Sequence, residues 1–168
     1  MKKDMLLELF NAQAHFGHYK KYRTPQLKNH IYKSINKIDF IDLELTIEQI
    51  TLAQSFLFRN NSKKILIVSN RDFVLDRDLN QVSIIKKWKP GYISNLRYGK
   101  LESIPDIVII DKAAYQYNLV KESIKANVTI IGICDTNTPF SIYNKIDYPI
   151  VINDDNNVAI ELLLNYLV

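Results

Sequence analysis

Short apolar runs alternate with amphipathic stretches along most of this chain. Four of the runs have the composition of buried parallel strands, at residues 65–68, 82–85, 107–110 and 128–134. They are rich in β-branched residues and do not alternate with polar ones, as is typical of strands covered on both faces by helices. A further strand is expected to end near residues 39–42, and a short one lies at residues 150–152.

Helical patterns lie between the predicted strands. Apolar residues recur at helical spacing in three segments, marked by Leu43, Ile47, Ile50 and Leu57, by Tyr117, Val120 and Ile124, and by Ala159, Leu162, Leu163 and Tyr166. Asn153-Asp154-Asp155 is expected to cap the last of these helices and to supply its acidic first turn. The alternation predicts an α/β fold: a single doubly wound, flavodoxin-like or Rossmann-like, mostly parallel sheet with helices on both faces.

The N-terminal residues 1–37 do not follow this alternation. They are expected to form one short helix, at about residues 3–13, and then a basic arm. We therefore divide the chain into the helix and basic arm at 1–37 and an α/β domain at 38–168. With 168 residues in all, the two parts are expected to form one structural domain.

Positive charge is concentrated in two segments. Residues 1–37 hold eight Lys and Arg against two acids, together with all three histidines, and residues 86–100 hold five cations and no acid. The formal net charge is only +4, so the rest of the chain is acidic. Two basic segments on an acidic body indicate an oriented surface for a polyanion. The alternative is a solvated charged face, which explains most single charge runs.

Aromatic residues accompany the cations in both segments, as a surface that binds phosphates and bases requires. The second segment follows a predicted strand, turns at Pro90-Gly91 and is expected to enter a short helix. A buried Trp88 between solvated lysines is the alternative there. The candidate RNA-binding residues are His15, Gly17, His18, Lys20, Lys21, Tyr22, Arg23, Lys28, Lys86, Lys87, Trp88, Lys89, Asn95 and Arg97.

A nucleotide-binding enzyme is the rival class, because folds of this kind often bind dinucleotides. Such a site needs glycines directly after the first strand, where backbone amides approach a pyrophosphate. The four glycines are too far apart for a phosphate loop, and the strand ending at Val68 continues into Ser69-Asn70-Arg71-Asp72. Asp111 and Asp135 follow predicted strands, where an enzyme would place catalytic groups. Turn and cap formation is the interpretation that we favour for both.

Metal and thiol chemistry have little support in the sequence. His15 and His18 have a spacing found in metal sites, but further ligands would have to come from distant parts of the chain. Stacking or hydrogen bonding is the favoured role of both rings. Cys134 ends an apolar strand without an adjacent cation or base, so we expect an inert buried thiol. We expect no cofactor, and no apolar run approaches the length of a membrane span.

Residue usage bears on where the gene resides. Residues with AT-rich codons (Phe, Tyr, Met, Ile, Asn and Lys) number 76, whereas Gly, Ala, Arg and Pro number 21. The first eight residues include two acids, which suits neither a secretory signal nor a transit peptide. An organellar gene, in the mitochondrion, is the favoured explanation, and a plastid or an AT-rich bacterial or nuclear genome is the alternative.

Seven fragments, in order, resemble one protein family. They are His15-Phe16-Gly17-His18 with the Thr24-Pro25-Gln26-Leu27-Lys28 that follows, Phe40 to Thr46, Lys64 to Val68, Trp88 to Asn95, Pro105-Asp106, Cys134 to Asn137, and Asp147 to Ile150 with Asn153-Asp154-Asp155. Together they resemble the small-subunit ribosomal protein two family, the universal "S two" ribosomal protein. The resemblance implies a non-enzymatic constituent of the small ribosomal subunit at the junction of head and body, near the messenger exit. Its implied partners are ribosomal RNA and neighbouring ribosomal proteins, with no membrane and no small-molecule substrate.

The chain also departs from the family pattern. The family's long helical hairpin would fall between Arg97 and Leu101, where this chain has only three residues. Lys89-Pro90 and Val151-Ile152 replace family Leu-Gly and Pro-Gly pairs. The contacts of that hairpin are therefore expected to be absent or to come from another protein.

Overall fold

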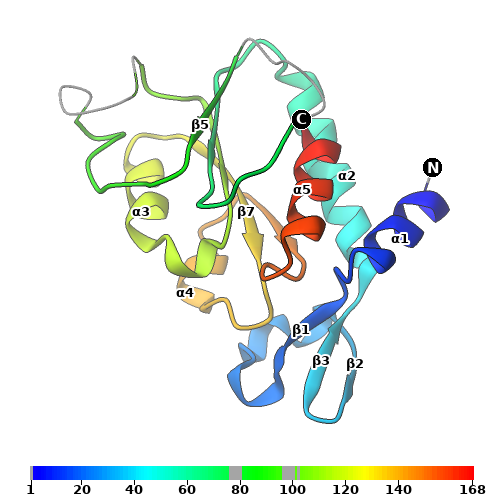
Figure 1. The fold of residues 1–168 in the computed structure, drawn as a ribbon. Coiled ribbons are helices and arrows are strands. Elements are labelled where there is room, and N and C mark those ends of the chain that lie inside the picture. The colour runs from blue at the N-terminus through cyan, green and yellow to red at the C-terminus, as the bar shows by residue number, and fades with distance from the viewer. Residues whose placement is uncertain (1, 76–80, 96–100, 102) are drawn as a thin grey trace.

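The parallel sheet predicted from the sequence forms the centre of the molecule. The computed structural model describes residues 2–75, 81–95, 101 and 103–168. Its main sheet has the order β5-β4-β6-β7-β8 and every pairing is parallel. The strands are β4 (Ile65–Val68), β5 (Val82–Ile85), β6 (Ile107–Ile110), β7 (Thr129–Cys134) and β8 (Tyr148–Val151). Helices cover both faces (Figure 1), so the predicted α/β class is confirmed.

The order in which successive strands are added to the sheet reverses at β4. This strand is the first of the five in the chain, yet it lies between β5 and β6. In flavodoxin-like sheets, ligands bind in the crevice at the carboxyl ends of the two strands that correspond to β4 and β6. The residues after Val68 and Ile110 therefore occupy the position at which an enzyme of this fold would hold its substrate.

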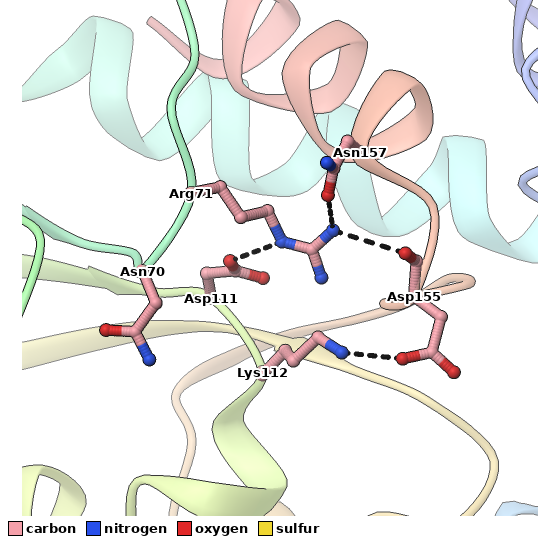
Figure 2. A pocket seen from close by; sticks show the side chains of 6 residues that line it. All are labelled: Asn70, Arg71, Asp111, Lys112, Asp155 and Asn157. Atoms are coloured by element: carbon pink, nitrogen blue, oxygen red, sulfur yellow. Dashed lines mark hydrogen bonds and ion pairs between the residues drawn. The ribbon is translucent and has the colours of Figure 1, made fainter.

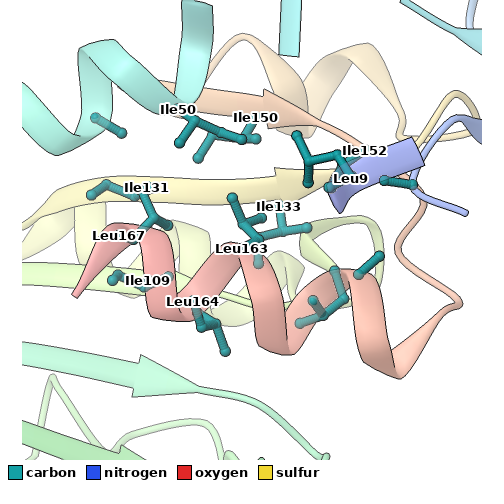
Figure 3. Packing of buried hydrophobic residues seen from close by; sticks show 14 of the residues in the cluster. Leu9, Ile50, Ile109, Ile131, Ile133, Ile150, Ile152, Leu163, Leu164 and Leu167 are labelled. Carbon is teal, nitrogen blue, oxygen red and sulfur yellow. The ribbon is translucent and has the colours of Figure 1, made fainter. Parts of the chain in front are cut away.

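One face of the sheet packs against α1 (Lys2–Asn11), α2 (Leu43–Arg59) and α5 (Asn157–Leu167). Figure 3 shows Ile131 and Ile133 of β7 facing Leu163 of α5, and Ile50 of α2 beside Ile150. All of these side chains are fully buried. Burying one such side chain stabilises a fold by about 1.5–3 kcal/mol, so this layer is a major contribution to stability.

The other face packs against shorter elements. These are the single-turn η4 (Ala113–Tyr115), α3 (Tyr117–Lys125) and α4 (Phe140–Tyr143). Tyr92 and Ile93, from the second basic segment, are buried in the same cluster. Residues 90–94 form consecutive turns, so the expected helix does not begin within the described part of this segment.

A second sheet, absent from our interpretation of the sequence, lies at one end of the molecule (Figure 1). It consists of β1 (Phe16–Tyr19), β3 (Ile38–Ile41) and β2 (Ile31–Ile35), in that order and antiparallel. The strand expected near residues 39–42 is thus present, but it pairs with strands of the basic arm. The short 3-10 helices η1 (Lys20–Tyr22) and η2 (Pro25–His30) connect β1 to β2.

Side chains cap the N-termini of α2 and α5, the two longest helices on the first face. Asp42 accepts a hydrogen bond from the Glu44 amide at 3.0 Å and caps α2. Asn156 accepts one from the Val158 amide at 3.0 Å and caps α5. The expectation that residues 153–155 cap this last helix is wrong, because these residues form a turn before it in which Asp154 is buried.

None of the helices in the described residues is long and apolar enough to cross a membrane.

Candidate nucleic-acid interface

The two basic segments meet the main sheet at the same edge. The second segment begins at Lys86, directly after β5, and the arm bonds to residues 136–138, directly after β7. Because the strands are parallel, both positions lie at the carboxyl edge, separated by β4 and β6. Three strand spacings amount to about 14 Å, which is within reach of one stretch of folded RNA.

The most exposed cations of the arm lie on η1 and η2. Lys20, Lys21, Tyr22 and Lys28 are all exposed. The Lys21 ammonium lies 4.5 Å from the centre of the Tyr22 ring, so charge and aromatic surface are presented together. These four predicted residues have the exposure that contact with RNA requires.

Hydrogen bonds fix the arm against the loop after β7. The backbone amide of His18 donates to Thr136 Oγ1 at 2.9 Å, and the Thr24 hydroxyl donates to the Thr138 carbonyl at 2.7 Å. Gly17 permits the close approach, since a Cβ there would lie 2.8 Å from Thr136 Cγ2. Gly17, predicted as an RNA-binding residue, is thus occupied by an internal contact.

His18 is the ionic link in the same junction. Its Nδ1 lies 3.0 Å from Oδ2 of Asp135, and its Nε2 lies 3.5 Å from a carboxylate oxygen of Asp155. The hydrogen bond with Asp135 raises the pKa of His18 above its usual value. Burial and the nearby Asp135 raise the pKa of Asp154 to about 7. His18, for which we predicted stacking or hydrogen bonding, is therefore held by a cluster of acids within the protein.

His15 faces a different environment from His18. Its ring stacks on Phe10 at 4.5 Å and lies 4.4 Å from the Phe16 ring and 5.9 Å from that of Phe40. Desolvation lowers the pKa of His15, which favours the neutral ring. This aromatic group lines a groove of about 540 Å³ between α1 and the small sheet. The two histidines, whose spacing suggested a metal site, have separate partners.

Arg23 is paired within the protein. Its Nη1 lies 3.3 Å from Oδ1 of Asp39, a fully buried carboxylate that also accepts a hydrogen bond from the Ser34 hydroxyl. The Arg23 side chain is only 16% exposed. Loss of this guanidinium would leave a buried charge without its cation, so Arg23 has a structural role in addition to any contact with RNA.

The second basic segment presents lysines around a packed tryptophan. Lys86, Lys87 and Lys89 are exposed, and Lys86 makes an ion pair with exposed Asp72. Trp88 is half-buried, with its ring 5.2 Å from that of Tyr92 in an edge contact. Trp88 therefore packs against the core between exposed lysines without being buried as the alternative required. Asn95 is exposed, and the predicted residue Arg97 lies outside the described residues.

Glu122 of α3 anchors this segment. Its carboxylate accepts hydrogen bonds from the amides of Gly91 and Ile93, at 2.6 and 3.3 Å. Gly91 has a φ of 99°, a conformation that residues with a side chain rarely adopt. A single glutamate in an amphipathic helix gives no sequence signal for this function, because exposed positions of helices usually hold such residues.

The crevice between the ends of β4 and β6 is spanned by ion pairs (Figure 2). Arg71 Nε lies 2.9 Å from Oδ2 of Asp111, and its other nitrogens donate to Asn157 and to the Asp154 and Asp155 carbonyls. Lys112 Nζ lies 2.6 Å from Asp155. The pocket that remains measures about 270 Å³. Arg71 thus ties β4 to the start of α5, across the position where a ligand would bind.

Both aspartates of the enzyme hypothesis are engaged by contacts within the protein. Asp111 accepts hydrogen bonds from Ser69 and Arg71. Asp135 accepts them from the amides of Thr136 and Asp154, in addition to its pairing with His18. Cys134 is fully buried, and burial raises the pKa of its thiol. The bond from the Thr136 amide agrees with turn formation at Asp135, whereas Asp111 is held by side chains about 40 residues away rather than by a turn or cap. The burial of Cys134 agrees with an inert thiol.

The fold and these surfaces define a basic α/β protein whose two basic segments present exposed lysines, with the ligand crevice of its sheet spanned by internal ion pairs. A family model described as "Ribosomal protein S2" matches residues 9–100 and 96–168. The chain belongs to this family.

Relatives in three organisms are similar over nearly the whole chain. A small ribosomal subunit protein uS2 of Karelsulcia muelleri (strain GWSS) is 28% identical, covering 92% of this chain and 92% of the relative. Proteins named uS2c, from Mesostigma viride and Cyanidium caldarium, are each 27% identical. They cover 99% and 96% of this chain and 95% and 87% of their own lengths.

Proposed function

We propose that this protein is a structural constituent of the small ribosomal subunit that supports translation by binding ribosomal RNA. The observation that carries the proposal is the family match along both halves of the chain, together with relatives named small ribosomal subunit proteins. The role is non-catalytic. It agrees with a crevice spanned by Arg71 and with cations gathered outside it.

Exposed cations of both basic segments would contact phosphates. On the arm these are Lys20, Lys21 and Lys28, with Tyr22 available for stacking, and on the second segment they are Lys86, Lys87 and Lys89. Neutralised phosphates release counterions, which drives association without reading sequence. Such contacts would position the protein on a folded RNA surface.

The buried members of the predicted site would act by holding these cations in place. His15, Gly17, His18 and Arg23 fix the arm, and Trp88 packs beneath the lysines that flank it. Asn95 and Arg97 would extend the second surface. We keep the division into a helix and RNA-binding arm at 1–37 and an α/β domain at 38–168, which carries the second basic segment, although the small sheet joins strands from both.

We further propose a position at the junction of head and body, beside neighbouring ribosomal proteins, in a mitochondrial ribosome. The family resemblance supports the position, and the excess of residues with AT-rich codons supports the organelle. Detection of the protein in small subunits purified from isolated mitochondria would support this location. Detection only in plastid or cytoplasmic subunits would contradict it.

The arm is tested by incorporation of the triple variant Lys20→Ala/Lys21→Ala/Lys28→Ala. Arg23 is left intact because its replacement would also leave the buried Asp39 without its cation and destabilise the fold. We expect less of the variant protein than of wild type to sediment with small subunits in low salt. The matched control changes three exposed lysines outside both basic segments, Lys121, Lys125 and Lys145. Equal incorporation of both variants would contradict an RNA role for the arm.

A further inference from the structure

Three lysines from separate parts of the arm line one cleft. Lys20 and Lys21 belong to η1, and Lys37 lies in the turn between β2 and β3. Together with Tyr19 they line a cleft of about 470 Å³. The backbone amide of Lys20 donates to the Lys37 carbonyl at 2.8 Å, which holds the two segments side by side.

Positive charge in this cleft is uncompensated. Among the residues that the structure describes, none of those lining it is acidic. Within the part of the chain that the structure describes, none of the three lysines makes an ion pair, whereas His18, Arg23, Arg71 and Lys112 all do. All three lysines are exposed, and no ion pair within the described residues accounts for three cations at this place.

The backbone conformation at Lys37 is unfavourable for a lysine. Ile35 pairs with Ile38, so Asn36 and Lys37 form a two-residue hairpin turn, and their φ angles are 49° and 67°. Both positions of such a turn are left-handed, and the second is usually glycine because a Cβ is crowded there. Asparagine suits the first position. Lysine is a poor choice for the second unless its side chain is needed.

We propose that this cleft binds a backbone phosphate of RNA and that Lys37 supplies the third cation. The inference rests on the proposed function and adds a residue that charge counting in the arm did not single out. Three ammonium groups offer up to nine N–H donors to the oxygens of one or two phosphates. Tyr19 is 52% exposed at the same cleft, where its ring could lie against the adjoining sugar or base.

Two glycine variants of the same turn separate charge from backbone conformation. Lys37→Gly relieves a crowded left-handed residue, so thermal unfolding should shift to higher temperature, whereas Asn36→Gly, at a position that asparagine suits, should change it little. Only Lys37→Gly removes a cation from the cleft. Lys37→Gln, which removes the charge and keeps a long side chain, shows whether a change in binding comes from charge or from the flexibility of glycine.

Binding is measured with the full chain and protein-free small-subunit ribosomal RNA, in filter-binding titrations over a range of salt concentrations. Lys37→Gly and Lys37→Gln should bind about five- to tenfold more weakly at 0.1 M salt, with the slope of log K against log salt reduced by about one. Asn36→Gly should bind like wild type. Competition by inorganic phosphate at constant ionic strength should have no effect, and displacement of RNA would assign the cleft to free anions.

The outcomes distinguish this inference from the proposed function. If wild type does not bind the RNA in a salt-dependent manner, the proposed function fails. If wild type binds and both Lys37 variants match Asn36→Gly in affinity and slope, the RNA role stands and the phosphate cleft is refuted.

Discussion

The Nδ1 atom of His18 lies 3.0 Å from Oδ2 of Asp135, which joins the N-terminal arm to the carboxyl end of β7. Asp135 is fully buried, so the histidine supplies a partner to a carboxylate that water does not reach. The arm is therefore an integral part of the fold, and the surface it presents depends on the state of this junction.

The junction makes stability depend on pH. The pKa of His18 is raised by its bond with Asp135, so the stabilisation is complete below the unfolded value of 6.5 and is lost as pH rises through the folded pKa. Asp154, whose pKa is raised to about 7 by burial, is destabilising once ionised and acts in the same direction. We expect the unfolding temperature to fall between pH 6 and pH 8, and to fall less in His18→Gln.

Thermal unfolding monitored by circular dichroism at both pH values provides the measurement. His15 and His30, whose pKa values are lowered by desolvation, have the opposite effect but are common to both proteins, so the difference isolates His18. Asp154→Asn should be more stable than wild type at pH 8, by at least about 1 kcal/mol, since one pKa unit corresponds to about 1.4 kcal/mol. Parallel pH profiles for all three proteins would contradict the assignment.

The ion pair between Arg71 and Asp111, at the carboxyl edge of the sheet, is expected to contribute to stability. Their side chains are 11% and 4% exposed, and removing one partner leaves a buried charge unpaired. Arg71→Met should therefore lower the free energy of unfolding by about 3 kcal/mol, measured by urea denaturation. The double variant Arg71→Met/Asp111→Asn should recover part of this loss because the unpaired charge is then also removed. Strictly additive effects would show that the pair is not coupled.

Gly17 and Thr136 test whether the glycine of the arm serves packing. In Gly17→Ala the new Cβ would lie 2.8 Å from Thr136 Cγ2, so unfolding should become easier by about 1–3 kcal/mol. Thr136→Ser removes that methyl group and keeps the hydroxyl that accepts from the His18 amide. The double variant should be more stable than Gly17→Ala, as measured by thermal unfolding. If serine gives no recovery, the contact with Thr136 is not the cause.

Replacing Trp88 tests whether its ring serves packing or base stacking in the second basic segment. Its ring packs against Tyr92 and the core, and its ring nitrogen has no hydrogen-bond partner among the described residues. Trp88→Phe should lower stability by about 1–2 kcal/mol and change affinity for small-subunit ribosomal RNA by less than about twofold. Lys87→Ala/Lys89→Ala should do the reverse, weakening binding with little change in stability. A large loss of affinity for the RNA in Trp88→Phe would instead indicate that the ring stacks on a base.

Much of the main sheet could be predicted from local pattern. Ile65–Val68, Val82–Ile85 and Ile107–Ile110 are strands at the predicted residues, because short β-branched runs covered by helices have few other stable conformations. The small sheet could not be predicted in the same way. Residues 31–35 are almost entirely exposed, so Ile31–Ile35 lacks the hydrophobic pattern that identifies a strand.

The sequence by itself determined the α/β class, the two basic segments, and the family resemblance, since each depends on residue type and order along the chain. Only the tertiary structure decided which of those cations face solvent. Arg23 and His18 look like their neighbours Lys20 and Lys21 in sequence, but folding brings Asp39 and Asp135 against them. A buried carboxylate requires a partner, and the residue that provides it is set by contacts between segments 16 to more than 100 residues apart.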